Sequence, residues 1–348
     1  MLIVKPNRTT WGRMTGRRRL LSGTAAAAIA RWSGARGQPV PTIRIARIQG
    51  INFLPTYLMQ RRTLVEQQAA QLGVPNARVE WIDFPGGGNA TDALLAGSVD
   101  VVSAGPGNML LLWDRTRGQV KGIVSHSALP ATLVSRDPRL RTIADYGPDD
   151  RIAVPTVLVS TQAILLQVAA AKAYGADQWR RLNANAVQLG HGDAYAAMLN
   201  PKHEVRSHFA SPPFITRELA NVAGAHVVTS SLDILGSPLS TAILFTTTRY
   251  ADQQAALIKA VVAASADAIA SIHAEPEQAV GDYLAISRDP IPPAELVSLL
   301  RQPDMVFDVK PVGTLLFSTF LSQVGLLRST PHAWTDYFLP DAATLGGS

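Results

Sequence analysis

Four short loops carry most of the chemistry that this sequence offers, because each places Gly, Pro or Ser between an expected strand and an expected helix. They are residues 86–89, 105–108, 159–161 and 211–213. The first backbone N–H groups of a helix have no partner within the helix and carry partial positive charge. Several helix starts around one cleft would hold a small anion without a buried Lys or Arg. Side-chain donors stand at the same positions: Asn89, Thr91, Asn108, Ser160 and Thr161.

Each of these polar residues has a second explanation, because Ser, Thr and Asn also cap helices without binding a ligand. The set is stronger evidence than any member, since all four loops stand between a strand and a helix. In open α/β sheets, ligands bind in the crevice beyond the carboxyl ends of the strands. Such pockets also need apolar walls, and of Phe53, Tyr57, Phe84 and Phe214 we expect Phe53 and Phe214 to supply them.

Other chemistries lack their motifs. Gly86 and Gly88 begin a G-x-G-x-x-G pattern, but Thr91 stands where the third Gly is required. The sequence has no G-x-x-x-x-G-K-[ST] loop, no G-x-S-x-G nucleophile turn and no H-E-x-x-H metal helix. It also has no Cys, which excludes disulfides, thiolate catalysis and zinc–thiolate sites. We therefore expect no enzymatic activity, no cofactor and no metal.

The basic and imidazole side chains do not suggest a site of their own. The seven histidines are not spaced as metal ligands, and surface or hydrogen-bonded structural roles account for them. His191 and His208 lie nearest the expected cleft. Arg44, Arg47 and Arg151 stand on or at the start of expected strands, where we expect pairing with acidic neighbours rather than contact with a ligand.

From Thr42 onward, short β-branched runs alternate with longer stretches of helical periodicity, as in βαβ units with a mostly parallel sheet. The sequence therefore predicts an α/β protein. The expected strands are residues 42–48, 78–83, 99–103, 120–126, 150–154, 187–189, 204–208, 225–229 and 241–247. The expected helices are residues 57–72, 90–96, 109–116, 161–174, 193–199, 214–221, 251–273, 276–285, 293–302 and 311–324.

The chain is expected to form two lobes, each large enough to bury its own core. A polar, turn-rich segment after Pro130 indicates passage into a second lobe, and the strand at 241–247 is expected to return to the first. The predicted parts are a leader at residues 1–37, a first lobe of residues 42–128 plus 241–340, and a second lobe of residues 129–240.

Positive charge is concentrated in the leader. The 348 residues carry a formal net charge of +6, but residues 1–37 contain eight of the 32 basic side chains and none of the 26 acidic ones. The remainder has 24 basic against 26 acidic side chains and no Lys/Arg-rich run. It offers no surface that would follow a phosphate backbone, so we discount nucleic acid as a partner.

The leader has the order of an export signal. Arg17-Arg18-Arg19-Leu20-Leu21 precedes the Ala-rich stretch 25–30, which is too short to span a bilayer. The arginine cluster resembles the twin-arginine (Tat) signal, with Leu20 in place of Phe. We expect cleavage near Gly37 and a periplasmic mature protein. A disordered basic arm would not explain why the apolar stretch directly follows the arginines.

Several segments resemble the nitrate/sulfonate/taurine class of solute-binding proteins of ABC importers, in the superfamily of the thiamine-pyrimidine binding proteins. The resemblance covers about residues 42–340. It rests on residues 43–54, on Asp92 to Val102 (DALLAGSVDVV), on Gly105-Pro106-Gly107-Asn108, on Ser211-Pro212-Pro213-Phe214 and on Trp334-Thr335-Asp336-Tyr337-Phe338.

The resemblance implies a type II periplasmic-binding-protein fold, in which two α/β lobes joined by two crossovers close by a hinge motion on a ligand between them. It implies a monomer that captures a small organic or inorganic anion, such as a sulfonate, taurine or nitrate, and delivers it to the permease and ATPase at the inner membrane. Carried over position by position, with Phe214 added as an apolar wall, the ligand-binding residues are Asn52, Phe53, Gly88, Asn89, Gly107, Asn108, Ser160, Thr161, Ser211, Pro212 and Phe214. In departure from the sulfonate receptors, no pocket arginine is evident.

Other classes share this fold. The pyrimidine-precursor synthase of thiamine biosynthesis carries a cysteine-rich iron motif, which this chain lacks. The sensing domain of a transcription regulator would need a basic helix-turn-helix where this chain has its export signal. A receptor that serves a non-ABC partner and a binder of a neutral, pyrimidine-type solute both stay open.

Overall fold

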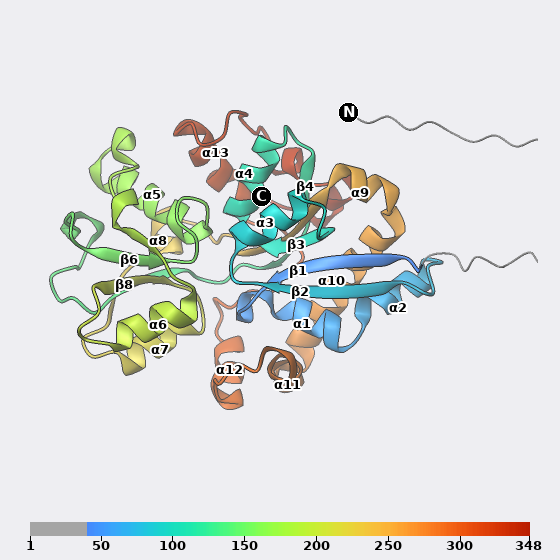
Figure 1. Cartoon of the computed structure of the whole chain (residues 1–348), viewed down its shortest axis with the longest axis horizontal. Coiled ribbons are helices and arrows are strands. Elements are labelled where there is room, and N and C mark those ends of the chain that lie inside the picture. The colour runs from blue at the N-terminus through green and yellow to red at the C-terminus, as the bar shows by residue number, and fades with distance from the viewer. Residues whose placement is uncertain (1–39) are drawn as a thin grey trace, which may run out of the picture. The chain divides into compact units, whose positions relative to one another are not determined.

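The computed structural model describes residues 40–348, so the predicted leader lies outside the described part of the chain. Ten strands form two five-stranded sheets, ordered β2-β1-β3-β10-β4 and β7-β6-β8-β5-β9 (Figure 1). The predicted α/β class is confirmed. The strands are β1 (Thr42–Ile48), β2 (Arg78–Phe84), β3 (Val101–Ala104), β4 (Val120–Ser127), β5 (Thr132–Ser135), β6 (Arg151–Val154), β7 (Ala186–Gln188), β8 (Val205–Ala210), β9 (His226–Ser230) and β10 (Ala242–Thr247).

The two sheets have the same pattern of directions. β1 runs parallel to β2 and β3, and β6 runs parallel to β7 and β8. β10 is antiparallel to β3 and β4, as β5 is to β8 and β9. Each of these antiparallel strands is the first that the chain forms after it crosses from the other sheet. We keep the names first lobe and second lobe, with the boundaries predicted above, for the parts around the two sheets.

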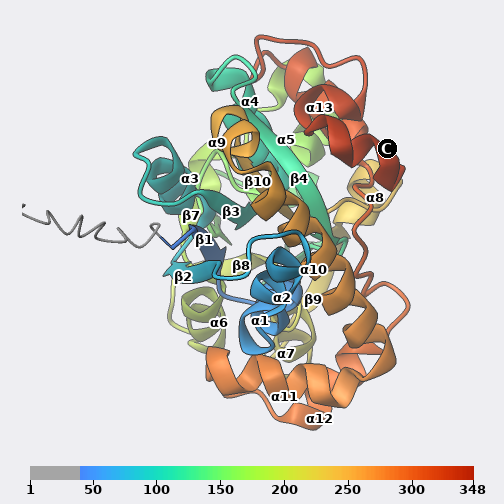
Figure 2. The ribbon, with the colours of Figure 1, turned by 90° about the vertical axis from the view of Figure 1, so that its right-hand side faces the viewer.

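Helices cover both sheets (Figures 1 and 2). In the first lobe they are α1 (Leu54–Arg61), α2 (Leu64–Gln71), α3 (Gly87–Leu95), α4 (Pro106–Arg115), α9 (Thr248–Gln253), α10 (Ala255–Ala274), α11 (Pro276–Ser287), α12 (Pro293–Leu300) and α13 (Thr314–Gln323). In the second lobe they are α5 (Thr161–Tyr174), α6 (His191–Leu199), α7 (Phe214–Asn221) and α8 (Ser231–Leu235). Short 3-10 helices are η1 (Ile51–Phe53), η2 (Ile143–Asp145), η3 (Ala176–Gln178), η4 (Asn183–Asn185), η5 (Trp334–Tyr337) and η6 (Pro340–Leu345).

Three local features differ from the sequence prediction. The helix expected at 57–72 is two helices, because Thr63 adopts a left-handed backbone with φ 50° between α1 and α2. The helix expected at 251–273 is likewise divided, with Gln254 non-helical between α9 and α10. β5 was not expected, since Thr132–Ser135 lies in a turn-rich stretch. It forms because strands on both sides pair with it and bury all four residues.

The core of the first lobe is built on α10, which packs against α1, α2 and β4 (Figure 2). Among the described helices, α10 alone is long and apolar enough to span a membrane, and half of that stretch is buried inside the fold. Val261, Ala264 and Ala268 are completely buried on this helix. Its apolar composition is therefore accounted for by the core.

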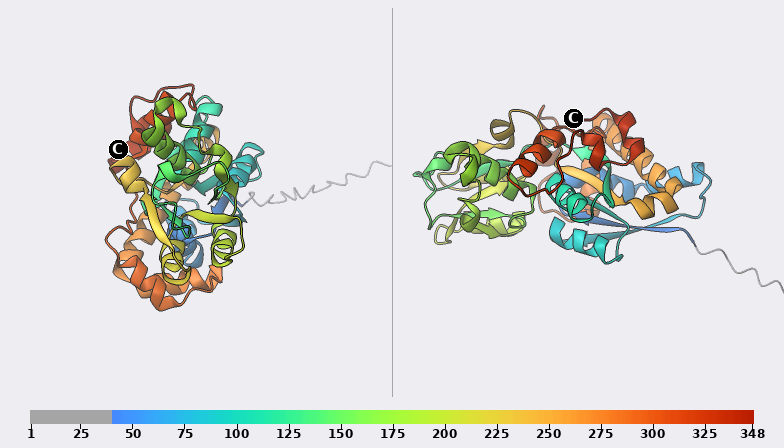
Figure 3. Two further views of the ribbon diagram at one scale, coloured as in Figure 1. Left: turned by 90° about the vertical axis from the view of Figure 1, so that its left-hand side faces the viewer. Right: turned by 90° about the horizontal axis from the view of Figure 1, so that it is seen from above.

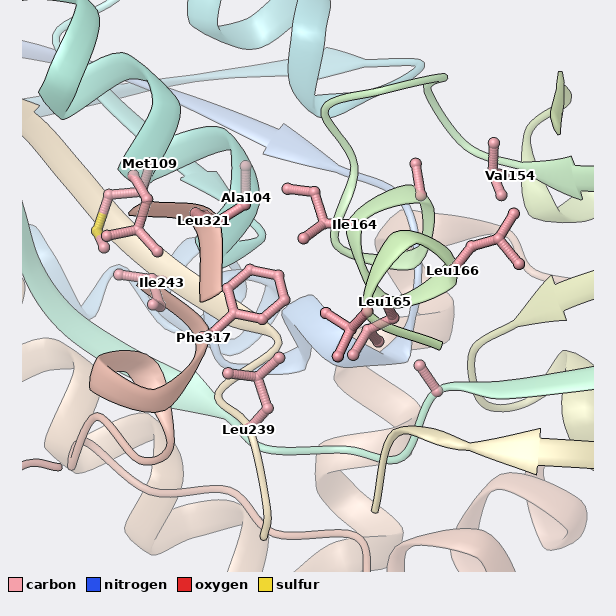
Figure 4. Packing of buried hydrophobic residues seen from close by; sticks show 14 of the residues in the cluster. Ala104, Met109, Val154, Ile164, Leu165, Leu166, Leu239, Ile243, Phe317 and Leu321 are labelled. Atoms are coloured by element: carbon pink, nitrogen blue, oxygen red, sulfur yellow. The ribbon is translucent and has the colours of Figure 1, made fainter. Parts of the chain in front are cut away.

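A second apolar cluster continues from the first lobe into the second. Ile164 and Leu165 of α5 lie toward Ala104, Ile243 and Phe317 of the first lobe (Figure 4). All five side chains are buried. Burial of a large aliphatic or aromatic side chain contributes about 1.5–3 kcal/mol, so this contact holds one side of the two lobes together.

Two adjacent crossovers join the lobes, which lie side by side in Figure 3. The first follows β4 and the second leads into β10. They are hydrogen-bonded to each other, since the N–H of Thr241 donates to the Ser127 carbonyl (2.7 Å) and the N–H of Leu129 donates to Oγ1 of Thr241 (3.0 Å). The N–H of Ser231 donates to the Ala131 carbonyl (2.7 Å). The crossovers thus form one connected strip, the arrangement expected of a hinge.

Candidate functional site

A cavity of about 470 Å³ lies between the lobes and is lined by both of them. It lies at the carboxyl ends of all six parallel strands, three from each sheet. The lining residues at or just after these ends are Ile48 (β1), Phe84 (β2), Gly105 (β3), Pro155 (β6), Gln188 (β7) and Ser211 (β8). This edge of an open α/β sheet is the usual place for a ligand.

Helix starts surround the same cavity. The helices α3, α4, α5, α6 and α7 each contribute a lining residue from the first turn: Gly87, Asn108, Thr161, His191 and Phe214. The helix η1 adds Asn52 and Phe53. Because the N-terminus of a helix carries partial positive charge and free N–H donors, this wall favours a negatively charged group.

Nine of the eleven predicted ligand-binding residues line the cavity: Asn52, Phe53, Asn89, Asn108, Ser160, Thr161, Ser211, Pro212 and Phe214. Gly88 and Gly107 do not line it. They face the opposite lobe instead: a Cβ on Gly88 would lie 3.4 Å from Cγ2 of Thr156. A Cβ on Gly107 would lie 2.8 Å from the Val159 carbonyl oxygen. Gly88 and Gly107 therefore lie where the two lobes contact each other.

Two cavity side chains have polar atoms without a partner. Oδ1 of Asn52 and Oγ1 of Thr161 are buried and make no hydrogen bond within residues 40–348. Two other cavity hydroxyls already accept a hydrogen bond, since Oγ of Ser160 accepts the N–H of Ala163 (3.2 Å) and Oγ of Ser211 accepts from Nε2 of Gln162 (2.9 Å). Buried polar groups are nearly always hydrogen-bonded, so Asn52 and Thr161 are the positions at which a ligand would complete the set.

The cavity has no cationic side chain among its described lining residues; Asp193 and His191 are the ionisable ones. Each of the three arginines considered above is engaged elsewhere. Arg44 donates to both carboxylate oxygens of Asp100. Buried Arg47 bonds Asp83 and lies 3.8 Å from the centroid of the Tyr57 ring. Arg151 donates to the Pro148 carbonyl. Positive potential at the cavity therefore comes from backbone N–H groups.

A chain of three side chains reaches the cavity wall from the core of the second lobe. Nδ1 of His191 lies 2.8 Å from Nε2 of His208, and Nδ1 of His208 lies 2.5 Å from Oε1 of Glu218. Burial raises the pKa of Glu218 to about 8 and lowers the pKa of His208 to about 3. Burial, together with the neighbouring His208, also lowers the pKa of His191. The pair His208–Glu218 is therefore neutral at pH 7.

The sequence analysis placed His191 near the cleft but did not select its loop, Gly190-His191-Gly192, which lines the cavity at the start of α6. The signal was present, because a Gly-flanked residue stands between the expected strand 187–189 and the expected helix 193–199. The four loops selected from the sequence have the same strand-loop-helix pattern. The lining residues Gln49, Thr156 and Thr241 carry no comparable local signal.

Within residues 40–348, no group of three or more His, Cys, Asp or Glu side chains is arranged to hold a metal ion. His191, His208 and Glu218 use their facing atoms on one another. The donors around the cavity are backbone N–H, hydroxyl and amide groups, which suit an oxyanion better than a transition metal.

The two sheets, the two crossovers and a cavity at the strand ends together define the periplasmic binding protein fold, which solved structures of this class share over most of their length. No family model matches the chain, and no curated protein matches it. The comparison with known proteins therefore rests on structure.

Three solved structures illustrate the similarity. The alkanesulfonate-binding protein SsuA from Xanthomonas axonopodis pv. citri, bound to MOPS, has a TM-score of 0.65 at 19% identity, over 84% of this chain and 96% of that chain. The periplasmic aliphatic sulphonate binding protein SsuA from Escherichia coli has a TM-score of 0.64 at 18% identity, over 87% and 92%. The periplasmic nitrate-binding protein NrtA from Synechocystis PCC 6803 has a TM-score of 0.61 at 13% identity, over 84% and 83%. The expected resemblance to this superfamily is thus confirmed at the level of the fold.

Proposed function

We propose that this chain is the substrate-binding protein of an ABC importer and that it binds a small anion between its lobes. The observation that carries the proposal is the convergence of five α-helix starts, together with η1, on one cavity at the ends of all six parallel strands. The Oγ1–H of Thr161 and the neighbouring backbone N–H groups donate to the anionic group, while Oδ1 of Asn52 accepts from a donor elsewhere on the ligand. The chain acts by binding and release and is not an enzyme.

The cavity favours an organic anion over a bare inorganic one. A volume of about 470 Å³ lies within the range of about 300–1,000 Å³ that is usual for small-molecule sites. Phe53, Phe84 and Phe214 line it beside the polar groups. A sulfonate matches both parts, because its oxygens accept from the helix starts and its carbon chain contacts the rings. Nitrate, taurine and related anions belong to the same proposal.

Delivery and location are part of the proposal. Solved structures with this fold include sulfonate- and nitrate-binding periplasmic proteins. In the same way this chain would be exported to the periplasm as a monomer, by the twin-arginine route, and would pass its ligand to a permease and ATPase in the inner membrane. Replacing Arg17 and Arg18 by Lys should leave the protein uncleaved in the cytoplasm, as fractionation and mass measurement would detect. Normal export of this variant would exclude the route.

Thermal unfolding of the purified protein against a ligand panel tests the binding function. The panel contains alkyl and aryl sulfonates, taurine, nitrate, bicarbonate and neutral pyrimidines. A ligand at 100 times its dissociation constant should add about 2.7 kcal/mol to the free energy of unfolding. Stabilisation by one class of anion supports the proposal, whereas stabilisation by a pyrimidine alone replaces it with a neutral-solute binder. Calorimetric titration of the responding ligand then gives stoichiometry and affinity.

The open alternative is a receptor that presents the same ligand to a non-ABC partner. The two are separated by reconstituting the cognate permease and ATPase in vesicles and measuring uptake with and without this protein. Uptake that depends on the protein supports the importer. Ligand binding without any uptake favours the receptor.

A further inference from the structure

His191, His208 and Glu218 connect the cavity to titratable groups in the core of the second lobe, which the helix starts do not. His191 is the first residue of α6 and lines the cavity, whereas His208 on β8 and Glu218 on α7 have no exposed surface. Successive atoms lie 2.8 Å and 2.5 Å apart. A continuous hydrogen-bonded path therefore leads from the cavity to a buried carboxyl group.

The surroundings of Glu218 indicate that this carboxyl group holds a proton. Its second oxygen, Oε2, is buried and makes no hydrogen bond within the described residues. An ionised carboxylate in that position would keep negative charge on an oxygen without a partner, which is costly away from water. The raised pKa of Glu218, about 8, agrees with this geometry.

With the proton on Glu218, both hydrogen bonds run in one direction. The carboxyl O–H donates to Nδ1 of His208, and Nε2–H of His208 donates to Nδ1 of His191. Nε2–H of His191 then remains as a donor for the cavity. Stacking of His191 on Phe214, with centroids 5.7 Å apart and an interplanar angle of 24°, holds the ring in place.

Loss of one proton reverses every bond. Glu218 then accepts from Nδ1–H of His208, Nε2 of His208 accepts from Nδ1–H of His191, and Nε2 of His191 presents a lone pair. The proton that leaves is the one on Nε2 of His191, while two others each move across one hydrogen bond. No heavy-atom bond changes. The buried carboxyl group thus exchanges its proton through the cavity.

We propose that Glu218, His208 and His191 form a proton chain open to the cavity, so that the site binds its anion together with one proton. The inference rests on the proposed function, because it requires an anion in the cavity. When protonated, the three residues carry no net charge and Nε2–H of His191 is a donor to the cavity. After loss of the proton, they carry one negative charge and Nε2 of His191 presents a lone pair. The preferred ligand is therefore an oxyanion that stays ionised and accepts a hydrogen bond from His191.

The other charged groups on the packed elements are few. On α6, Asp193 lines the cavity and Tyr195 packs on Phe214; on α7, Arg217 lies over the Tyr195 ring, 4.7 Å from its centroid. On β8, Arg206 pairs with Asp137, and on β6 Arg151 bonds the Pro148 carbonyl. β5 has no titratable residue between Thr132 and Ser135. Asp193 is thus the group to control for.

The first test needs no ligand. Nitrogen-15 NMR of the histidine rings in the full chain should show His191 as the Nε2–H tautomer at about pH 6.5 and as the Nδ1–H tautomer above about pH 9. In the Glu218→Gln variant, whose amide donates to His208 but cannot ionise, His191 should stay Nε2–H throughout. The proton chain would be overturned if His191 did not change tautomer in the wild type, or if it changed tautomer in the same way in Glu218→Gln. The wild-type spectrum decides alone if the variant does not fold.

The second test measures anion affinity against pH, with ethanesulfonate and nitrate, which keep one negative charge from about pH 5 to 10. The wild-type dissociation constant should be constant below about pH 7.5 and rise about tenfold per pH unit above about pH 8, as one linked proton requires. Glu218→Gln should give a flat profile, and Asp193→Asn should keep the wild-type slope. Identical profiles for wild type and Glu218→Gln would overturn the coupling.

A third result separates this inference from the proposed function. If neither anion binds wild type or any variant at any pH, the anion-binding function fails and the coupling fails with it. The tautomer measurement still shows whether the three residues move a proton. If both anions bind and only the pH profile is flat, the proposed function stands and the coupling is rejected.

Discussion

Gly107 in the first turn of α4 lies directly against Val159, which precedes α5 in the other lobe: a Cβ on Gly107 would be 2.8 Å from the Val159 carbonyl oxygen. It would also be 2.6 Å from Cδ1 of Ile164. Real Cβ atoms do not come this close, so a methyl group at position 107 requires the backbone at Val159 in the other lobe to move away. The absence of a side chain at Gly107 is therefore a condition for the cavity as it stands.

We expect Gly107→Ala to weaken ligand binding by about fivefold to 150-fold, because closure now meets a steric cost of about 1–3 kcal/mol. Gly88→Ala is the matched control, since its Cβ would meet Cγ2 of Thr156 at an ordinary 3.4 Å. Calorimetry gives the affinity, and small-angle scattering shows whether the lobes stay apart. Equal affinities for the two variants would contradict the steric explanation.

Thr161→Val should weaken ligand binding without lowering the stability of the free protein. Oγ1 of Thr161 is buried at the cavity and has no partner within the described residues, so its removal breaks no internal hydrogen bond. The loss should be about 0.5–1.5 kcal/mol of binding free energy. Thr246→Val is the contrasting variant, because Oγ1 of Thr246 donates to the Asp100 carbonyl (2.6 Å) away from the cavity. Thr246→Val should lower the free energy of unfolding and leave the affinity unchanged. If instead Thr161→Val lowered only the free energy of unfolding and Thr246→Val lowered only the affinity, Thr161 would not belong to the site.

The stability of the free protein should fall as pH rises from about 6.5 to 8. The folded state holds a proton on Glu218 up to its pKa of about 8, whereas the unfolded chain has lost it above the ordinary value of 4.5. More protons bound in the folded state mean that stability decreases with pH, by up to about 1.4 kcal/mol per pH unit.

Below about pH 6.5 the histidines act in the opposite direction. Burial lowers the pKa of His126 and of His208 to about 3, so the unfolded chain binds their protons first and stability rises with pH there. Wild type should therefore be most stable near pH 6.5. Denaturant unfolding at several pH values measures the curve, and Glu218→Gln should lack the decline on the alkaline side. An unchanged decline in this variant would assign it to another group.

Asp100→Asn should destabilise the fold without affecting the cavity. The carboxylate accepts from the guanidinium and the backbone N–H of Arg44, and it joins β1 to the start of β3. Hydrogen bonds to a charged partner contribute about 1.5–3 kcal/mol when they are partly buried. Thermal unfolding should show a loss of this order, with the same dissociation constant as wild type. A large loss of affinity would mean that the strand ends are less rigid than this arrangement implies.

Much of the secondary structure could be predicted from local pattern. β1, α5 and α7 lie within the residues that periodicity selected, because alternation, capping by Ser160 and the Pro residues before α7 act over a few neighbours. The strand-loop-helix positions of Asn108, Thr161 and Phe214 followed from the same signals, since a helix that follows a parallel strand must begin at its carboxyl end. The α/β class and the kind of site are therefore properties of the sequence itself.

The tertiary structure decided what those positions face. Gly107 and Thr161 have similar sequence settings, yet one lies in the contact between lobes and the other lines the cavity, because the placement of the two sheets fixes which atoms meet. His191, His208 and Glu218 come from a helix, a strand and a second helix. No periodicity relates residues on three elements, so their hydrogen-bonded path exists only once α6 and α7 pack side by side against the sheet that contains β8. Burial of that path, which sets its protonation, is likewise a property of the assembled lobe alone.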